Sequence, residues 1–349
     1  MKKIKVFLGG VVNVSNAQNN NCRSLIEYLD DKKFEVFSLQ SMREDRFIIK
    51  GAKFFIIPQP IKIFKYLAFA WGIMRCDIAY LPKTECMTWN RFLCKIFSKK
   101  YFRTIESILD INDGKVPAKI VDYKKTDNLY SITGFMKKYN LDKCGIESHD
   151  KIMYLGVDEK KDIKIRNKTQ LKNTVLIGHD LKRKGIHDYL KLAKSHPDIK
   201  FHIIGSGNNK VDVEKLVSTH NQENNIENIV FHGSLSSEQV EHVIENNDID
   251  LLVLPSHSEG FPKVILECAR FGIPSLLYST YGAKEWIDHD SNGFVCDTLE
   301  EMSDKVDELI RNPRLLCDVG SQSVNLYEEF KWSSKVKDWE EEMIKIWRS

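Results

Sequence analysis

The sequence predicts an α/β protein with two domains, each built on a parallel β-sheet. Its 349 residues are too many for one ordinary core and suit two domains of about 150 residues each. Short β-rich runs alternate with helical patterns along the whole chain, which is the order expected of βαβ units. Most of the clearest runs end at glycine or proline. We therefore expect one parallel sheet in each half.

The first half contains five runs that predict strands: KIKVFLGG at 3–10, FEVFSLQ at 34–40, KFFIIP at 53–58, DIAYLP at 77–82 and KKYFRTIES at 99–107. After the first run, Gly9 and Gly10 fit a turn in which the backbone approaches a donor or an acceptor. A tight turn without a ligand explains the same two residues equally well.

The second half shows the scheme more clearly, with runs NTVLIG at 173–178, KFHIIG at 200–205, NIVFHG at 228–233, IDLLVLP at 249–255 and PSLLYS at 274–279. Helical segments lie between them. This succession predicts a Rossmann-like domain, whose ligands sit at the carboxyl ends of the strands and beside helix N-termini.

The polar stretch 158–173 has the composition of a linker, so the domain boundary is expected near Asp158. At the other end, KVKDWEEEMIKIWRS predicts an amphipathic helix that packs across a domain junction. Its apolar stripe consists of Val336, Trp339, Met343, Ile346 and Trp347.

Composition is that of a soluble globular protein, with 42% hydrophobic and 29% charged residues. Eight cysteines are scattered without a C-x-x-C pair, which favours reduced thiols in the cytoplasm over a zinc site. The N-terminus begins with basic residues, but its short apolar run predicts a first strand rather than a signal peptide.

Charge is divided unevenly between the halves. Residues 1–157 hold 27 Lys and Arg against 16 Asp and Glu, whereas residues 158–349 hold 25 against 33. The excess of positive charge lies in residues 46–103, where twelve basic residues face only Asp77 and Glu85 among many aromatic residues. This composition predicts a surface that lies on anionic lipid. A solvated, lysine-rich face over a buried helix is the alternative.

Within that region the longest uncharged run, 66–74, is well short of the roughly 20 residues needed to span a bilayer. Nucleic acid is the other polyanion to consider. No nucleic-acid-binding signature accompanies the charge, so no nucleic-acid partner is expected.

Two glutamates stand out in SEGFPKVILECARFGIP, residues 258–274. Pro262 and Gly272 predict a helix from 262 to 271. Glu259 then lies just before the N-terminus, where free N–H groups attract anions, and can hydrogen-bond a polyol. Glu267 lies inside the apolar helix and needs partners. They are either the two hydroxyls of a vicinal diol, such as a ribose, or structural backbone and lysine groups.

With these motifs in place, residues 151–332 resemble the donor-binding domain of retaining glycosyltransferases of the GT-B fold, in family 4 (glycosyl transferases group 1). The E-x7-E pattern with GFPKV is the most specific match. The others are GHDLKRKG at 178–185, VFHGSLSSEQV at 230–240, LPSHSEGF at 254–261, YGAKEWI at 281–287 and SNGFV at 291–295. YLGVD at 154–158 and FKWSS at 330–334 resemble the crossovers between the domains.

The resemblance implies two facing Rossmann-like domains with a C-terminal helix that crosses back to the first domain. The first, 1–157 with about 333–349, would bind the acceptor and face the membrane. The second, 158–332, would bind the nucleotide-sugar donor.

Carried over by position, the resemblance implies that Glu267 holds the ribose, that Glu259 and the backbone of Gly260 and Phe261 hold the sugar, and that Lys184 meets the diphosphate. A lysine there can neutralise charge that develops on the leaving group. Taken alone, Lys184 would be a solvated cation. Glu259 and Lys184 are the predicted catalytic residues. The other predicted donor-binding residues are Gly9, Gly10, His179, Arg183, Gly205, Leu235, Pro262, Lys263 and Val264.

Two departures from the family pattern stand out. His179 follows the glycine of its loop where the family usually has arginine, so Arg183 or a protonated His179 is expected to substitute. Relatives often place a first-domain histidine near the transferred sugar, but the first histidine here is His149. Glu106 or a backbone group is the expected replacement.

Two further patterns are discounted. Asp248-Ile249-Asp250 matches a manganese-binding D-x-D, but it leads directly into a strand and is expected to be a turn. GSGNNK at 205–210 lacks the third glycine of a dinucleotide fingerprint and is expected to be a phosphate-side or base-side loop. No metal and no cofactor are expected besides the nucleotide-sugar co-substrate.

The sequence thus predicts transfer of a sugar, with retention, to a lipid-linked saccharide in bacterial surface polysaccharide synthesis such as lipopolysaccharide or capsule. Cell-wall glycolipid synthesis and a soluble sugar acceptor are the next possibilities. The expected location is cytoplasmic, at the inner face of the cytoplasmic membrane. Two other functions stay open: a nucleotide-sugar 2-epimerase of the same fold, and a non-catalytic nucleotide-sugar-binding protein.

Overall fold

The computed structural model describes residues 3–14, 16–46, 48–49, 51–83, 85–109, 114, 116–160, 170–209, 211–225 and 227–349. The chain forms two compact units. Unit 1 consists of Met1–Glu159 and Phe330–Ser349, and unit 2 consists of Lys160–Glu329. The expected boundaries, near 158 and 333, lie within a few residues of these. Most of the expected linker, 161–169, lies outside the described residues.

Unit 1 contains a six-stranded parallel sheet in the order β3-β2-β1-β4-β5-β6. Its strands are β1 (Ile4–Val11), β2 (Phe34–Ser41), β3 (Ala52–Ile57), β4 (Ile78–Tyr80), β5 (Lys100–Ile105) and β6 (Leu129–Ser131). The five predicted strands are present. The sixth, β6, has only three residues and was missed because so short a run carries no periodic signal.

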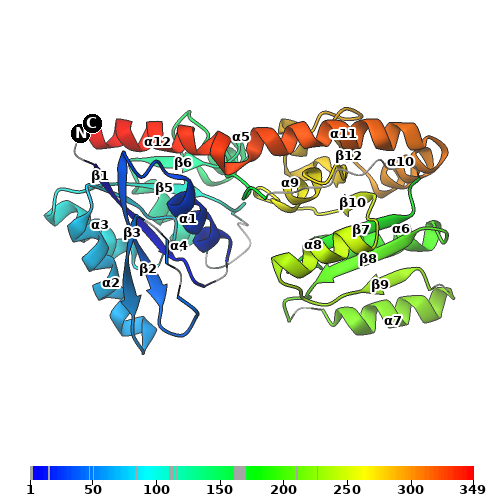
Figure 1. The fold of residues 1–349 in the computed structure, drawn as a ribbon, viewed down its shortest axis with the longest axis horizontal. Coiled ribbons are helices and arrows are strands. Elements are labelled where there is room, and N and C mark those ends of the chain that lie inside the picture. Colours follow the sequence, from blue (N-terminus) through cyan, green and yellow to red (C-terminus); the bar gives the residue numbers. More distant parts are fainter. Residues whose placement is uncertain are drawn as a thin grey trace. The chain divides into compact units, whose positions relative to one another are not determined.

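The helices of unit 1 are α1 (Ala17–Tyr28), α2 (Ile61–Arg75), α3 (Met87–Ile96), α4 (Val116–Lys124), α5 (Gly134–Cys144) and α12 (Trp332–Arg348). The helix α2 packs on β1, β2 and β3 and against α3 (Figure 1). Phe7 and Phe69 meet edge to face in the core beneath it, with ring centroids 5.8 Å apart. That burial anchors one side of α2 while its other side stays exposed.

The turn expected at Gly9 and Gly10 is wrong, because β1 continues to Val11. Both glycines are buried in the strand, where the pairing with β2 shifts register between Phe7 and Val11. A Cβ on Gly10 would lie 2.8 Å from the Cβ of Cys22. Close packing of the strand on α1 therefore accounts for the lack of a side chain at Gly10.

The C-terminal helix α12 packs on β4, β5 and α1 of unit 1, as the red helix in Figure 1 shows. Its apolar stripe is confirmed for four residues, since Val336, Trp339, Met343 and Ile346 are buried. Trp347 is an exception, 44% exposed, because Ile346 takes the inward position in the last turn. The expected return of the C-terminal helix to the first domain is confirmed, and its packing across a domain junction stays a prediction.

Unit 2 contains a second six-stranded parallel sheet, in the order β12-β11-β10-β7-β8-β9. Its strands are β7 (Asn173–Gly178), β8 (Lys200–Gly205), β9 (Ile229–Phe231), β10 (Leu251–Leu254), β11 (Ser275–Tyr278) and β12 (Phe294–Cys296). The predicted bounds of β7 and β8 are confirmed, and β9, β10 and β11 are shorter than predicted. Only β12 was missed. The predicted α/β class with two parallel sheets is confirmed.

The helices of unit 2 are α6 (Ile186–Ser195), α7 (Val213–Asn224), α8 (Ser237–Asn246), α9 (Val264–Ala269), α10 (Leu299–Arg311) and α11 (Pro313–Phe330), with 3-10 turns η1 (Ser279–Tyr281) and η2 (Ala283–Glu285). Among the helices that the structure describes, none is both long and apolar enough to cross a bilayer.

The helix predicted over 262–271 is wrong in length, because α9 has six residues. The amide of Ile265 bonds to the carbonyl of Pro262, three residues back, so the chain enters α9 through a tight turn. At the other end Gly272 adopts a positive φ of 70°, and its amide bonds to the carbonyl of Ala269. The predicted stop at Gly272 is thus confirmed, but the regular helix between the two ends is shorter.

Candidate active site

The strand order of unit 2 reverses at β7, which lies between β10 and β8. The segments that follow β7 and β10 lead to opposite sides of the sheet. Ligands of such sheets bind at the carboxyl ends of the two strands between which the order reverses. The loop after β7 carries His179, Arg183 and Lys184, and the loop after β10 carries Glu259. The two loops bring together the residues that sequence motifs had singled out separately.

Glu259 is the centre of this cluster and is 5% exposed. Its Oε1 lies 2.8 Å from Nζ of Lys184 and accepts a 2.8 Å hydrogen bond from the hydroxyl of Ser256. Its Oε2 lies 3.0 Å from Nη1 of Arg183, which also donates to the carbonyl of Ser258. One carboxylate thereby holds two cations at the carboxyl edge of the sheet.

The electrostatics of the cluster keep Glu259 ionised. Burial by itself raises the pKa of this carboxyl group, but the positive charges of Lys184 and Arg183 outweigh burial and lower the net pKa below its ordinary value. The negative charge of Glu259 also affects Tyr281. Burial, and next this charge, raise the pKa of the Tyr281 hydroxyl. A buried anion with two cations in contact is therefore a fixed feature of unit 2.

Glycines make room for this arrangement. A Cβ on Gly178, the last residue of β7, would lie 2.8 Å from Cε of Lys184, so the lysine side chain lies directly over that glycine. Gly185 adopts a φ of 81°, and a Cβ there would lie 1.9 Å from the carbonyl oxygen of Pro255. The loop after β7 can approach the loop after β10 only with glycine at that position.

Arg183 and His179 are the two candidates for a second cation beside Lys184. The structure shows Arg183 in an ion pair with Glu259. The side chain of Arg183 is 42% exposed, so a ligand can reach it. The side chain of His179 is exposed, and its backbone carbonyl accepts a 3.0 Å hydrogen bond from Ser206. The structure thus brings Arg183 beside Lys184 at Glu259, and which of Arg183 and His179 replaces the usual arginine stays a prediction.

Glu267 lies on α9, half-buried among buried apolar neighbours, as its sequence context predicted. Before it, Phe261 packs edge to face on Trp286 with ring centroids 5.3 Å apart. The remaining predicted residues of this segment have buried side chains (Pro262, Val264) or are half-buried (Gly260, Lys263).

A hollow of about 800 Å³ lies at the carboxyl ends of β8 and β9. Gly205 lines it and adopts a φ of 134°. A Cβ on Gly205 would lie only 1.6 Å from the carbonyl oxygen of Gly178. Asn208 and Asn209 also line it and adopt positive φ angles. The predicted residue Leu235 is half-buried and follows Ser234, another lining residue.

The D-x-D pattern at 248–250 is a turn that leads into β10. Oδ2 of Asp250 accepts hydrogen bonds of 2.9 Å from the amides of Lys172 and Asn173, and Asp248 has a positive φ of 47°. Asp250 thus ties the start of β10 to the start of β7. Within the described part of the chain, no three His, Cys, Asp or Glu side chains are grouped to hold a metal ion.

In unit 1 the strand order reverses at β1 and β4, and a pocket of about 410 Å³ lies at the carboxyl side of β4 and β5. Glu106 lines it. Oε2 of Glu106 accepts a 2.8 Å bond from Nδ2 of Asn21, and Oε1 accepts a 2.8 Å bond from the hydroxyl of Tyr80 and a 3.0 Å bond from Thr104. Lys83 lines the same pocket, and its pKa is lowered by burial and then by the nearby Lys65.

Some residues of these sites were missed by sequence reasoning. Ser256 stands inside the quoted motif LPSHSEGF, but nothing in the sequence indicates that its hydroxyl would meet Glu259. Tyr80 and Asn21 are far from Glu106 in sequence, and only the adjacency of β4, β5 and α1 brings them together.

Part of the chain is similar in sequence to known proteins. Residues 157–325 match the family model described as Glycosyl transferases group 1. An uncharacterized glycosyltransferase of Haemophilus influenzae is 30% identical over 188 residues, which are 52% of this chain and 50% of that protein. Alpha-galactosylglucosyldiacylglycerol synthase of Streptococcus pneumoniae is 31% identical over 172 residues, 49% of this chain and 42% of that protein. The chain thus spans about half the length of the curated relatives it matches.

The fold recurs in solved structures. Anabaena HepE in complex with UDP and glucose aligns with a TM-score of 0.75 at 14% identity, over 98% of this chain and 100% of that one. Residues 157–325 thus match the family of glycosyl transferases group 1, and the chain with its two parallel-sheet units has the GT-B fold.

Proposed function

We propose that this chain transfers a sugar from a nucleotide-diphosphate donor to a saccharide acceptor, with retention of anomeric configuration, as family 4 enzymes do. The observation that carries the proposal is the buried carboxylate of Glu259 in contact with Lys184 and Arg183 at the point where the strand order of unit 2 reverses. A diphosphate needs two adjacent cations, and a sugar needs hydrogen-bonding groups beside them.

In the donor complex, the diphosphate oxygens contact Lys184 and Arg183. The cations then share their charge with the phosphates, and the carboxylate of Glu259 accepts hydrogen bonds from sugar hydroxyls. Glu267 accepts hydrogen bonds from the ribose. The UDP and glucose bound by a structural neighbour of the same fold support a nucleotide-sugar donor.

The reaction breaks the bond between the anomeric carbon and the phosphate oxygen and forms a bond from that carbon to an acceptor oxygen on the same face. The acceptor hydroxyl gives its proton to the departing phosphate. Negative charge grows on the diphosphate, where Lys184 and Arg183 stabilise it. These two cations supply the charge that a metal ion would otherwise supply, so we propose that the reaction needs neither metal nor cofactor.

We place the acceptor in the pocket of unit 1 that Glu106 lines, where a fixed carboxylate and Lys83 offer hydrogen bonds to a saccharide. The acceptor is a lipid-linked saccharide of a bacterial surface polysaccharide, lipopolysaccharide or capsule, and a relative whose name is that of a glycolipid synthase supports a lipid acceptor. Residues 46–103 hold the protein on the anionic inner face of the cytoplasmic membrane.

A donor screen tests the proposal. Sugars linked to UDP, GDP, ADP and CMP are offered to the wild type, and saturation-transfer NMR and slow donor hydrolysis are measured. Glu267→Ala and Glu259→Gln are compared with Glu223→Gln, an exposed glutamate at the end of α7. We expect selective binding and slow cleavage in the wild type and in Glu223→Gln. Glu267→Ala should lose binding, and Glu259→Gln should lose cleavage by at least about tenfold.

Other outcomes separate the alternatives. A new nucleotide sugar formed without any acceptor would identify a 2-epimerase. Selective binding with no cleavage, even with saccharide acceptors present, would identify a non-catalytic binder. Turnover unchanged in Glu259→Gln would show that the cluster is not the reaction centre.

A further inference from the structure

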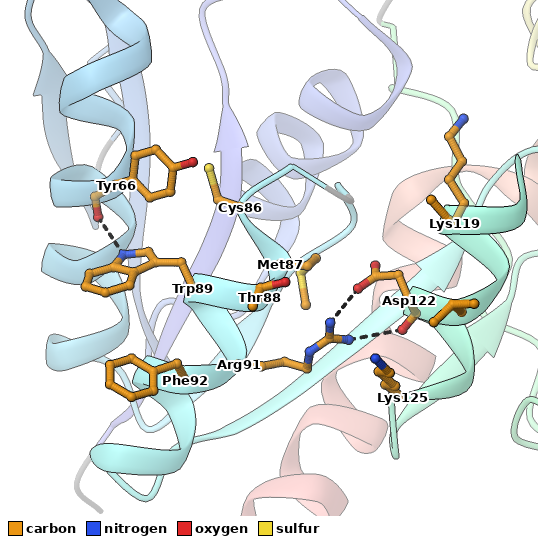
Figure 2. Close-up of a pocket in the computed structure, with 12 residues that line it drawn as sticks. Tyr66, Cys86, Met87, Thr88, Trp89, Arg91, Phe92, Lys119, Asp122 and Lys125 are labelled. Atoms are coloured by element: carbon orange, nitrogen blue, oxygen red, sulfur yellow. Dashed lines mark hydrogen bonds and ion pairs between the residues drawn. The ribbon is translucent and has the colours of Figure 1, made fainter. Parts of the chain in front are cut away.

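A groove of about 860 Å³ lies in unit 1 between α3 and α4, with α2 at its edge. Figure 2 shows its two unlike sides. Tyr66, Trp89 and Phe92 form an aromatic wall from α2 and α3, with the rings of Trp89 and Phe92 stacked at 5.8 Å. Lys119 and Lys125, at α4 and just beyond it, lie on the other side.

The one acidic side chain among the residues that line the groove is already neutralised. Oδ1 of Asp122 lies 2.7 Å from Nη2 of Arg91, and its Oδ2 lies 2.6 Å from Nη1 of Arg103, which is fully buried. Asp122 therefore holds the guanidinium of Arg91, another lining residue, and its charge is paired with arginines rather than with the lysines. The groove as a whole carries positive charge beside an aromatic surface.

The helices that form the aromatic wall also carry the largest concentration of exposed apolar side chains in the described chain. Ile63 and Leu67 of α2 are 66% and 57% exposed, and Ile96 of α3 is 56% exposed. Lone exposed apolar residues are ordinary, but a group on two adjacent helices marks a surface that meets an apolar phase. The groove thus opens beside a surface suited to lipid.

The groove also adjoins the pocket that contains Glu106. Lys119 lines both, and the consecutive residues Glu85 and Cys86 line the pocket and the groove respectively. The helix α4 and the turn before α3 are therefore a shared wall. A ligand with a saccharide at one end and an anionic, lipid-bearing group at the other can occupy both hollows at once.

We propose that this groove binds the phosphate and the adjoining lipid chain of the acceptor, which is a phosphate ester of a long-chain lipid alcohol. Lys119, Lys125 and Arg91 contact the phosphate, and the aromatic wall receives the first part of the chain. The proposal rests on the function proposed above, since it names the part of the acceptor that lies beyond the transferred sugar. The positive charge favours a phosphate and the aromatic wall favours a lipid chain, whereas a free phosphate would leave the aromatic wall without a partner.

The probe is farnesyl phosphate, a water-soluble phosphate ester of a lipid alcohol, titrated into the full chain by calorimetry. Farnesol, inorganic phosphate and vesicles of phosphatidylglycerol are the comparison ligands. The variant Lys119→Ala/Lys125→Ala is matched by Lys138→Ala/Lys143→Ala, two exposed lysines of α5 in the same unit. Trp89 fluorescence locates the ligand, since the signal change should vanish in Trp89→Phe. Thermal melting shows that each variant is folded.

We expect saturable binding of farnesyl phosphate, at least tenfold weaker binding of farnesol, and no binding of inorganic phosphate at the same concentrations. The groove variant should bind farnesyl phosphate at least tenfold more weakly than the α5 variant. Equal binding by the two variants, or inorganic phosphate that competes as well as farnesyl phosphate, would overturn the proposal. So would vesicle binding that depends on the groove lysines when farnesyl phosphate does not bind.

Donor binding is measured on the same samples. Donor binding reports on unit 2, so a wild-type protein that binds no donor would count against the proposed function. Lipid-phosphate binding reports on the groove alone. The two failures are therefore distinguishable.

Discussion

Glu259 illustrates how one buried carboxylate organises its surroundings. A charged group that is 5% exposed is costly unless it is paired, and here each oxygen meets a cation. The pairing places an ammonium and a guanidinium, two good phosphate ligands, at one point of the sheet edge. The positions of both cations therefore depend on the glutamate.

Replacing Lys184 with alanine should destabilise the protein by about 3 kcal/mol at pH 7, because a buried carboxylate loses its closest partner while Arg183 remains. Glu259 has a pKa below its ordinary value of 4.5, so its ionisation stabilises the fold above that pH and the contribution is lost as pH falls through the lowered pKa. Without Lys184 the pKa should rise. Urea denaturation at several pH values checks this, with a smaller difference from the wild type near pH 4.

The matched control is Lys182→Ala, an exposed lysine in the same loop, which should change the unfolding free energy by less than about 0.5 kcal/mol. Equal losses for the two variants at pH 7 would mean that the contact with Glu259 contributes nothing to stability.

The glycines at the ends of the loop after β7 should respond differently to alanine. In Gly178→Ala the new Cβ meets the flexible Lys184 side chain, which can shift, so the protein should fold while transfer falls about tenfold or more through a displaced ammonium. In Gly185→Ala the Cβ meets backbone at a positive φ, so folding itself should suffer. Thermal melting and transfer rates on the same preparations separate the two effects. A Gly185→Ala protein as stable as Gly178→Ala would contradict this.

At the scale of elements, α9 and α12 show what sequence patterns convey. Gly272 was correctly predicted to stop α9, but Pro262 is not its first residue, because a tight turn between Pro262 and Ile265 leaves a regular helix of six residues. In α12 the apolar stripe was correct in period and wrong at its last residue. Patterns specify the buried face of a helix better than its ends, where local bonding decides.

Trp339 should be the most important residue of α12 for stability. It is fully buried, its Nε1 donates a 2.9 Å hydrogen bond to the carbonyl of Tyr154, and its ring packs edge to face on Tyr80 at 5.3 Å. Trp339→Ala should cost about 3–5 kcal/mol of unfolding free energy, whereas Trp347→Ala should cost less than about 0.5 kcal/mol. Urea denaturation measures both. Similar costs at the two positions would show that α12 does not dock as described.

At the scale of the whole molecule, stability should depend on a histidine pair in unit 2. Nδ1 of His202 lies 2.9 Å from Nε2 of His232, and the rings are stacked. Burial, and next the neighbouring His232, lower the pKa of His202 from 6.5 to about 4. The folded protein thus favours the neutral ring, so the stabilisation is complete above about pH 6.5 and is lost as pH falls towards 4.

His202→Asn should flatten this dependence. The decrease in melting temperature between pH 7.5 and pH 5 should be smaller in the variant than in the wild type, because the variant has no buried imidazole to protonate. His187→Asn, a variant of another histidine in unit 2, should keep the wild-type dependence. If His202→Asn and the wild type lost stability in parallel, the pair would not be the acid-sensitive element.

The uneven charge of the chain also belongs to this scale. The basic residues of 46–103 lie in the same segment of the chain as the exposed apolar side chains of α2 and α3, and the proposed contact with an anionic bilayer rests on both. Sequence composition indicated the region. The division between the buried and exposed sides of α2 emerged only from its packing on β1, β2 and β3.

By itself the sequence determined the α/β class, the bounds of β7 and β8, and the family whose model residues 157–325 match, because alternation of apolar residues and spacing of motif residues are local properties. It also singled out Lys184, Arg183 and Glu259. Only the tertiary structure decided that these three side chains meet, with Arg183 and Lys184 both in contact with Glu259, and that Gly10 allows close packing of β1 on α1. The reason is the strand order. β10 pairs directly with β7 although α6, β8, α7, β9 and α8 lie between them in sequence, and this pairing brings distant loops to one edge of the sheet.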